Sequence, residues 1–76
     1  MNNKKRELLR GAIKHLGAAL RIVESVLDKE SDSLENLPDN LQNSELCDRI
    51  ERAVDSMNEA IEQIESAQES IENAIS

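Results

Sequence analysis

The chain has 76 residues, a formal net charge of −7, one cysteine, one histidine and no aromatic side chain. This length allows one small domain, the single cysteine excludes an intramolecular disulfide, and the single histidine argues against a zinc site. In so short a chain, the free energy gained by burying apolar side chains only about cancels the entropy cost of ordering the chain. We therefore expect stabilisation by association with other chains.

The charge is distributed unevenly. Residues 1–22 carry six basic side chains and only Glu7 as an acidic one, whereas the rest of the chain carries fifteen acidic and three basic side chains. No stretch approaches the roughly eighteen consecutive apolar residues of a membrane span, and Arg10 and Lys14 interrupt any signal-peptide core. We therefore expect a cytoplasmic protein without a membrane span, and the free Cys47 agrees with that compartment.

The first predicted helix runs from about Lys4 to about Lys29. Its apolar residues recur at alternating steps of three and four, which is the heptad seam of a helix that packs lengthwise on another helix. The seam residues are Leu9, Ile13, Leu16, Leu20, Val23 and Leu27. Further apolar or small residues lie beside them: Leu8, Ala12, His15, Ala19, Ile22 and Val26. Because this arc is wider than one neighbouring helix covers, a second contact surface is expected.

Residues 30–43 are the predicted connection, with Leu34, Leu37 and Leu41 spaced as in one or two helical turns. Pro38 suits the first position of a short helix, where its missing N–H costs nothing. One interpretation is a hydrophobic plug that closes the end of a helical hairpin. The other is a docking loop, in which Leu34, Leu37, Pro38 and Leu41 bind a groove on another protein.

The second predicted helix covers residues 44–75, with Ser44 as its N-cap. It has the same seam spacing, in Cys47, Ile50, Val54, Met57, Ile61, Ile64, Gln68, Ile71 and Ile75. Beside the seam, alanine returns every seven residues, at Ala53, Ala60, Ala67 and Ala74. The sequence thus predicts an all-α fold: an antiparallel, coiled-coil-like two-helix hairpin with an alanine-rich seam, which assembles into a homodimeric four-helix bundle or a larger symmetric oligomer.

If the turn places Leu27 beside Cys47, facing residue numbers add to about 74. Gln68 then lies near Glu7, where it either fixes the register of the helices or is merely solvated at a fraying end. The basic end of the first helix runs beside the acidic side chains Glu59, Glu62, Glu65, Glu69 and Glu72. Such exposed charge pairs favour the antiparallel orientation more than they add stability.

The residues offer no evident catalytic, cofactor-binding or metal-binding set, so we expect a protein that is not an enzyme and needs no cofactor. Cys47 and His15 are about 18 Å apart in the predicted register, too far for a nucleophile and its base. We expect Cys47 to be a small buried side chain and His15 a half-covered surface residue. The carboxylates Glu62, Glu65, Glu69 and Glu72 lie off the seam, and no Glu-x-x-His pair accompanies them, unlike in a di-iron bundle.

The block Glu35–Gln42, which contains Asn-Leu-Pro-Asp-Asn-Leu-Gln, precedes Ser44 and a heptad helix that includes Asn58–Ile61. Together these residues resemble a loose set of small acidic helical-hairpin proteins of bacteria and their phages and mobile elements. The resemblance covers residues 34–76. It implies a phage or mobile-element origin, and it implies no mechanism because no activity is attached to that set.

Three hypotheses for function follow. The first is an interaction protein, a phage or mobile-element accessory that binds itself and inhibits a host defence component. The second is capture of a small phosphorylated ligand, such as a signalling nucleotide, at subunit interfaces by a basic cluster: Lys4, Lys5, Arg6, Arg10, Lys14 and His15. The third is mimicry of nucleic acid by the acidic helix. Net acidity and the lack of aromatic side chains argue against binding long nucleic acid or a membrane surface.

Overall fold

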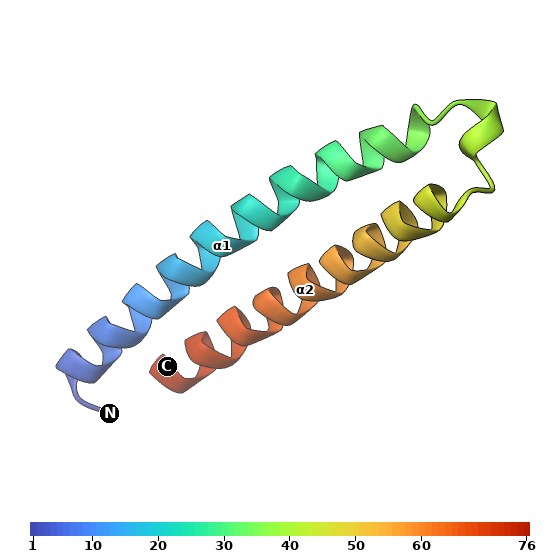
Figure 1. The fold of residues 1–76 in the computed structure, drawn as a ribbon. Coiled ribbons are helices and arrows are strands. Elements are labelled where there is room, and N and C mark those ends of the chain that lie inside the picture. Colours follow the sequence, from blue (N-terminus) through green and yellow to red (C-terminus); the bar gives the residue numbers. More distant parts are fainter.

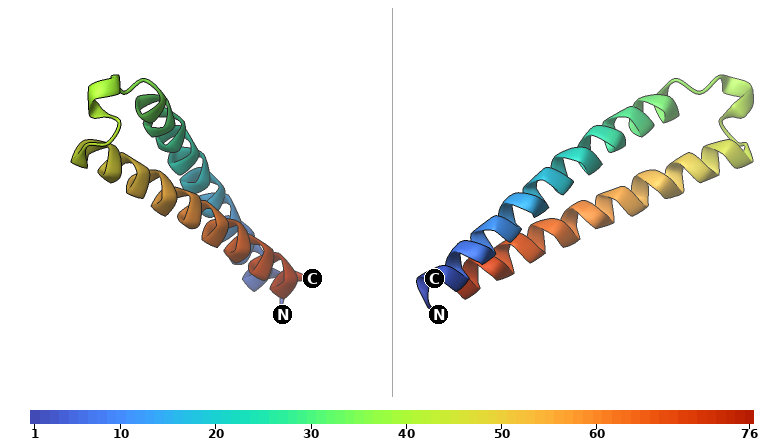
Figure 2. Two further views of the ribbon diagram at one scale, coloured as in Figure 1. Left: turned by 90° about the vertical axis from the view of Figure 1, so that its right-hand side faces the viewer. Right: turned by 60° about the vertical axis from the view of Figure 1, so that its left-hand side comes forward.

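The computed structural model describes all 76 residues, as two long antiparallel α-helices joined by a turn, with no β-strand (Figure 1). Helix α1 spans Asn3–Glu35, the 3-10 helix η1 spans Asp39–Leu41, and helix α2 spans Glu45–Ile75. The views agree that α1 and α2 run side by side and that both termini lie at the end opposite the turn (Figures 1 and 2). The predicted all-α antiparallel hairpin is confirmed.

Both helices begin at a side-chain cap. The side-chain oxygen of Asn2 accepts a hydrogen bond of 2.8 Å from the backbone N–H of Lys5. Ser44 does the same for α2, because its Oγ accepts from the N–H of Cys47 at 3.2 Å. Each cap satisfies a backbone donor that has no partner within the helix. The predicted role of Ser44 as N-cap is confirmed.

Helix α1 is longer than predicted: it ends at Glu35 and not near Lys29. No glycine or proline interrupts the polar residues after Lys29, and Leu34 lies one heptad after Leu27, so the seam continues. The extra turns end at Asn36, whose backbone N–H and side-chain Nδ2 both donate to the carbonyl oxygen of Asp32, at 3.0 and 2.8 Å. The predicted loop 30–43 therefore begins too early.

The turn is a compact helical connection. Pro38 was predicted to be the first residue of the short helix, but it precedes η1 as its N-cap. The carbonyl oxygen of Pro38 accepts a hydrogen bond of 2.8 Å from the N–H of Leu41. The Oγ of Ser44 then donates to the carbonyl oxygen of Leu41 at 2.6 Å. These bonds tie η1 directly to the start of α2. The chain thus reverses through a hydrogen-bonded turn.

The longer α1 changes which residues face each other. Arg6 meets Ile75 and Gly17 meets Gln68, so facing numbers add to 81 and 85, not to about 74. The Nε2 atom of Gln68 lies 3.6 Å from the point where a Cβ on Gly17 would sit. The predicted position of Gln68 beside Glu7 is wrong because the turn lies further along the chain. A shift of about one heptad keeps seam residues opposite seam residues.

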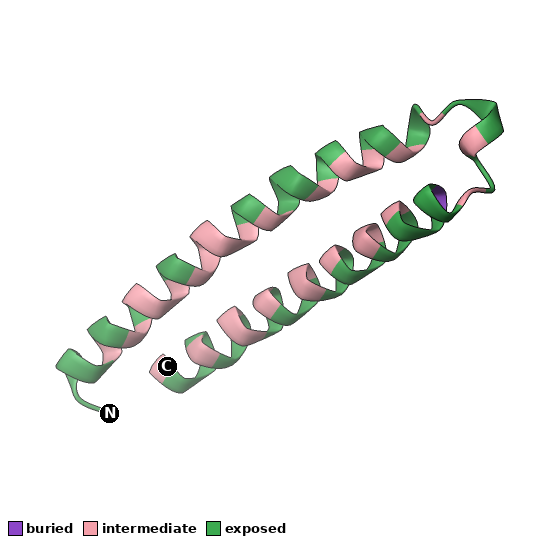
Figure 3. Cartoon of the chain, in the orientation of Figure 1, coloured by how far each residue is buried: buried purple, intermediate pink, exposed green.

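The hairpin is a thin rod with almost no interior. Its extents are 60 × 15 × 13 Å, and its radius of gyration is 17.3 Å, whereas a compact chain of this length has about 11 Å. Only Cys47 is buried, with 5% of its surface exposed. The half-buried residues form a band on the side of each helix that faces the other, and the outward sides are exposed (Figure 3). One hairpin therefore covers only part of its apolar surface.

Candidate interaction surface

A second line of apolar and small residues runs along α1, outside its contact with α2. We call it the outer stripe, and it consists of Leu8, Ala12, His15, Ala19, Ile22 and Val26. Its members recur at steps of four and three, and at 3.6 residues per turn the stripe lies about 100° round the helix from the seam. Leu8 is 69% exposed, Ile22 66% and Val26 44%. The largest side chains of the outer stripe are thus in solvent.

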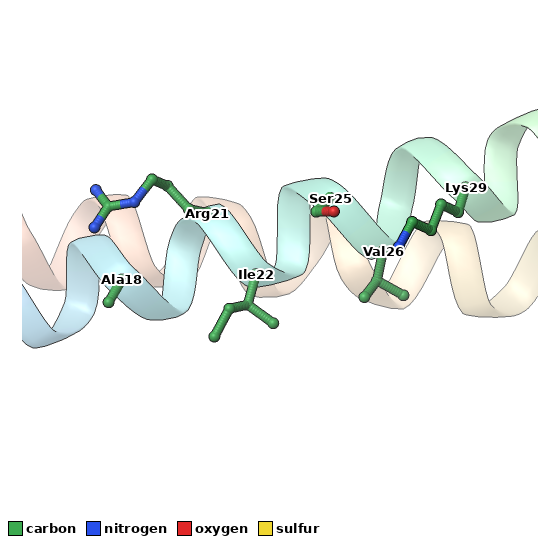
Figure 4. A pocket seen from close by; sticks show the side chains of 6 residues that line it. All are labelled: Ala18, Arg21, Ile22, Ser25, Val26 and Lys29. Atoms are coloured by element: carbon green, nitrogen blue, oxygen red, sulfur yellow. The ribbon is translucent and has the colours of Figure 1, made fainter.

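A shallow groove of about 530 Å³ lies on the same side of α1. Ala18, Ile22 and Val26 form its apolar part and point to one side of the helix, while Arg21, Ser25 and Lys29 form its polar edges (Figure 4). The floor consists of small and aliphatic side chains, and the basic groups stand at its border. This arrangement suits contact with an apolar helix that has acidic side chains at its margins.

Helix α2 has a corresponding line beside its own seam. We call it the alanine flank, and it consists of Leu46, Ala53, Ala60, Ala67 and Ala74. Leu46 is 42% exposed, and the alanines from Ala53 to Ala67 are half-buried. The exposed residues next to the flank are uncharged along most of its length: Ser56, Gln63 and Ser70. From Ala60 to Ala74 a second helix can therefore approach α2 closely without displacing a charge from water, whereas the exposed Arg49 lies beside Leu46 and Ala53.

The basic cluster lies at the open end of the hairpin. Most of its members are exposed, namely Lys4, Lys5, Arg10, Lys14 and His15. Arg6 is different: its Nε donates a hydrogen bond of 3.1 Å to the carbonyl oxygen of Ile75, and its Nη1 donates to Asn3 Oδ1 at 3.4 Å. Arg6 therefore contacts the end of α2, whereas the side chains of the other members are in solvent.

Three leucines lie at the closed end of the hairpin, one in the last turn of α1 and two in the connection. Leu34, Leu37 and Leu41 are half-buried, whereas Pro38 is exposed. Cys47, the one buried residue, lies two residues into α2 beside this turn. The plug interpretation likewise places the three leucines at the closed end of the hairpin. Of the four residues of the docking-loop interpretation, only Pro38 is exposed.

Cys47 and His15 are kept apart by the fold. Cys47 lies at the turn, while His15 is exposed and about 30 Å of helix separates it from the end of α1. Burial and the neighbouring carboxylate of Glu51, which accepts a 3.5 Å hydrogen bond from the Cys47 Sγ, raise the pKa of this thiol. A protonated, buried thiol is a poor nucleophile. The fold thus keeps the single histidine away from this sulfur, whose only hydrogen-bond partner is the carboxylate that raises its pKa.

The acidic side chains of α2 face outward. Glu62, Glu65, Glu69 and Glu72 are all exposed, and no three His, Cys, Asp or Glu side chains are grouped so as to hold a metal ion. Neither α1 nor α2 combines the length and apolar character that crossing a membrane requires.

Two features of this surface were not predicted from the sequence. The contact of Arg6 with Ile75 depends on the true register, and a charged residue near a chain end gave no local signal for it. Gly11 is the other: a methyl group placed on it would meet no atom within 4 Å, so nothing in a single hairpin requires a glycine there. Comparisons of the chain with protein families, curated proteins and solved structures find no match.

Proposed function

We propose that the protein is a non-enzymatic interaction protein that works as a homo-oligomer, either a homodimeric four-helix bundle or a larger symmetric assembly. The observation that carries this proposal is the exposure of the outer stripe: Cys47 alone is buried, whereas Leu8 and Ile22 are 69% and 66% exposed. Continuous apolar surface of this kind marks a contact surface. Chains of this length that lack disulfides and metals gain a core by association.

The assembled bundle, in this proposal, binds and inhibits a host defence component, as an accessory protein of a phage or another mobile element. The resemblance of residues 34–76 to small acidic helical-hairpin proteins of such elements supports this origin. In such a bundle the turn, with Pro38 exposed at its tip, remains accessible to a host protein.

Sedimentation velocity at micromolar concentration tests self-association. The proposal predicts a dimer or larger species, and a folded monomer would overturn it. Binding to a host protein is tested by comparing the wild type with a Leu37→Ser, Leu41→Ser variant that retains its helical circular dichroism. The leucine variant is expected to lose partner binding, whereas a matched Asn40→Ser, Asn43→Ser control is expected to keep it.

Capture of a small phosphorylated ligand is a second candidate, favoured by the exposure of Lys4, Lys5, Arg10 and Lys14 within a few turns of one another. It predicts that a nucleotide raises the unfolding temperature and that Arg10→Glu abolishes the rise. Arg10 is a better test than Arg6, because replacing Arg6 also removes the bond to Ile75. An unfolding temperature that no nucleotide changes would exclude this candidate.

Mimicry of nucleic acid is the third candidate, and the observation in its favour is the exposed row of carboxylates on α2: Glu62, Glu65, Glu69 and Glu72. It predicts that replacing all four with glutamine abolishes inhibition of a nucleic-acid-binding partner while self-association persists. Unchanged inhibition by the quadruple variant would exclude it.

A further inference from the structure

We propose that the outer stripe of α1 packs against α2 of a second copy of this chain. In the resulting dimer the two-fold axis runs parallel to the length of the hairpins. Both turns then lie at the same end of the dimer. This inference rests on the proposed self-association and adds three things to it: the face that is used, the element that occupies it and the orientation of the two copies.

The excess exposed area of one hairpin is about the area that one partner buries in a protein interface. The hairpin exposes 5694 Å², whereas a folded monomer of 8.5 kDa exposes about 4,700 Å². The excess of about 1,000 Å² is close to the roughly 800 Å² that each partner buries in a stable protein interface. A second copy of the chain is thus sufficient to bring the exposed area per chain to that of an ordinary folded protein.

The position of the outer stripe on α1 fits a bundle of four helices. In a square bundle each helix has two neighbours, about a quarter-turn apart, and α2 of the same chain is one of them. The outer stripe lies about 100° from the seam, where the second neighbour of such a bundle would pack. Helix α1 therefore has the two apolar sides that a bundle helix needs, and α2 covers only one of them.

The outer stripe and the alanine flank lie on the same face of the hairpin. Ala12 directly precedes Ile13, and Ala60 directly precedes Ile61, which hold the same seam position on the two helices. In an antiparallel pair, positions that flank the seam in this way lie on one side of the pair. The face of one hairpin thus consists of the outer stripe, which carries the large side chains Leu8, Ile22 and Val26, beside the alanine flank, which is alanine from Ala53 to Ala74.

Large and small lines pair best when the two faces are superposed with α1 over the partner's α2. Leu8, Ile22 and Val26 then meet alanine and serine side chains, and both layers of helices stay close together. The opposite pairing stacks large side chains on large ones along α1 and leaves the alanine flanks facing each other. The first arrangement is favoured because large side chains packed on small ones keep all neighbouring helices at a similar distance, as close packing requires.

Charge favours the same arrangement. Residues 1–22 carry six basic side chains and one acidic, and residues 59–76 carry five acidic and none basic. With both turns at one end, the basic half of α1 runs beside the acidic half of the partner's α2. With the turns at opposite ends, α2 lies along the partner's α2, and acidic side chains meet acidic ones. Opposite charges at the border of an interface select orientation in this way.

The orientation is tested by electron paramagnetic resonance distances between spin labels. Asn40 is exposed in η1, and a Cys47→Ala, Asn40→Cys chain carries one label at the tip of the turn. Layers of helices pack about 10 Å apart, so turns at the same end place the labels within about 30 Å. Labels separated by about the 60 Å length of the hairpin would overturn the orientation while leaving self-association intact. A chain that sediments as a monomer would overturn both proposals.

The face itself is tested by Ile22→Gln, with Glu24→Gln as the control two residues away on the exposed surface. Ile22→Gln is expected to weaken dimerisation at least about tenfold, because each copy loses an aliphatic group from the interface. Glu24→Gln should leave the dissociation constant within about twofold. Equal dimerisation by the two variants, with helix content unchanged, would show that the outer stripe is not the contact.

On α2 the matched pair is Ala60→Gln, in the alanine flank, and Ser66→Gln, at an exposed position away from it. Ala60→Gln places a long side chain where the partner's α1 packs and is expected to weaken dimerisation by a similar factor. If only Ile22→Gln weakens the dimer, the partner's α2 is not the occupant of the outer stripe.

Discussion

Arg6 and Ile75 join the two helices at the open end of the hairpin, across a separation of 69 residues in sequence. The guanidinium Nε of Arg6 donates a hydrogen bond of 3.1 Å to the backbone carbonyl oxygen of Ile75. The last carbonyl groups of an α-helix have no partner within the helix, and the helix dipole places partial negative charge there. A cation on α1 therefore stabilises the end of α2.

Replacing Arg6 with glutamine is expected to loosen the last turn of α2. A net hydrogen bond is worth about 1 kcal/mol, which corresponds to roughly fivefold faster amide exchange near Ile75. Hydrogen exchange measured by NMR checks this, with Lys5→Gln as the control because Lys5 is exposed. Equal exchange rates in the two variants would contradict a role for Arg6 at this helix end.

Removing the cap of α2 is expected to destabilise the hairpin. Ser44→Ala removes the acceptor of the Cys47 N–H and the donor to the Leu41 carbonyl oxygen, and an N-cap of this kind is worth about 1 kcal/mol. Urea unfolding followed by circular dichroism measures the loss. Ser66→Ala, in the middle of α2, should be neutral or slightly stabilising; a comparable loss there would point to a cause other than capping.

Gly11→Ala is expected to stabilise the helix by about 0.5–1 kcal/mol, because alanine has the higher helix propensity and its methyl group meets no atom within 4 Å. Gly17→Ala is the natural comparison. Its Cβ would lie 3.6 Å from Gln68 Nε2, which is an ordinary contact, so a similar gain is expected. Thermal unfolding at one fixed protein concentration measures both, and a loss of stability in Gly11→Ala would show that another chain approaches this glycine closely.

The raised pKa of Cys47 predicts a dependence of stability on alkaline pH. Burial first, and then Glu51, keep the thiol protonated in the folded chain, whereas an unfolded thiol ionises near pH 8.5. The stabilisation from Cys47 is therefore complete below about pH 8.5 and is lost as the pH rises through the folded-state pKa. Urea unfolding across this range, compared with Cys47→Ala, should show a difference that shrinks at high pH. A constant difference would contradict the assignment.

Thiol reactivity gives a second measure of the same pKa. Iodoacetamide reacts with the thiolate, so folded Cys47 should react more slowly than the unfolded chain at a pH near 8.5. Equal rates in the folded and unfolded chains would show that the side chain is neither buried nor perturbed.

The helical hairpin was predictable because one simple period runs through most of the chain. Leu9 to Leu27 and Cys47 to Ile75 repeat at steps of three and four, which only helices place on one side. The end of α1 was not predictable from this pattern. Residues 30–33 are polar, so the apolar signal fades before the helix does, and the deciding bonds from Asn36 to Asp32 depend on the folded backbone.

The register was missed for the same reason. Each added turn of α1 moves the reversal along the chain, and heptad patterns match equally well after a shift of one heptad. Gln68 therefore lies beside Gly17, and Arg6 reaches Ile75. The apolar outer stripe of α1 was visible in the sequence through Leu8, His15 and Ile22. The exposure of these residues and the groove beside them depend on how the two helices pack, so the sequence did not predict them.

The most direct test of the central claim is the dependence of the unfolding temperature on protein concentration. A hairpin that gains its core from a second copy should unfold at higher temperature as concentration rises, because association stabilises only the folded chain. Ile22→Gln should unfold at lower temperature throughout and need a higher concentration to show the same rise. An unfolding temperature that is identical from low to high concentration would contradict self-association and leave the hairpin as a folded monomer.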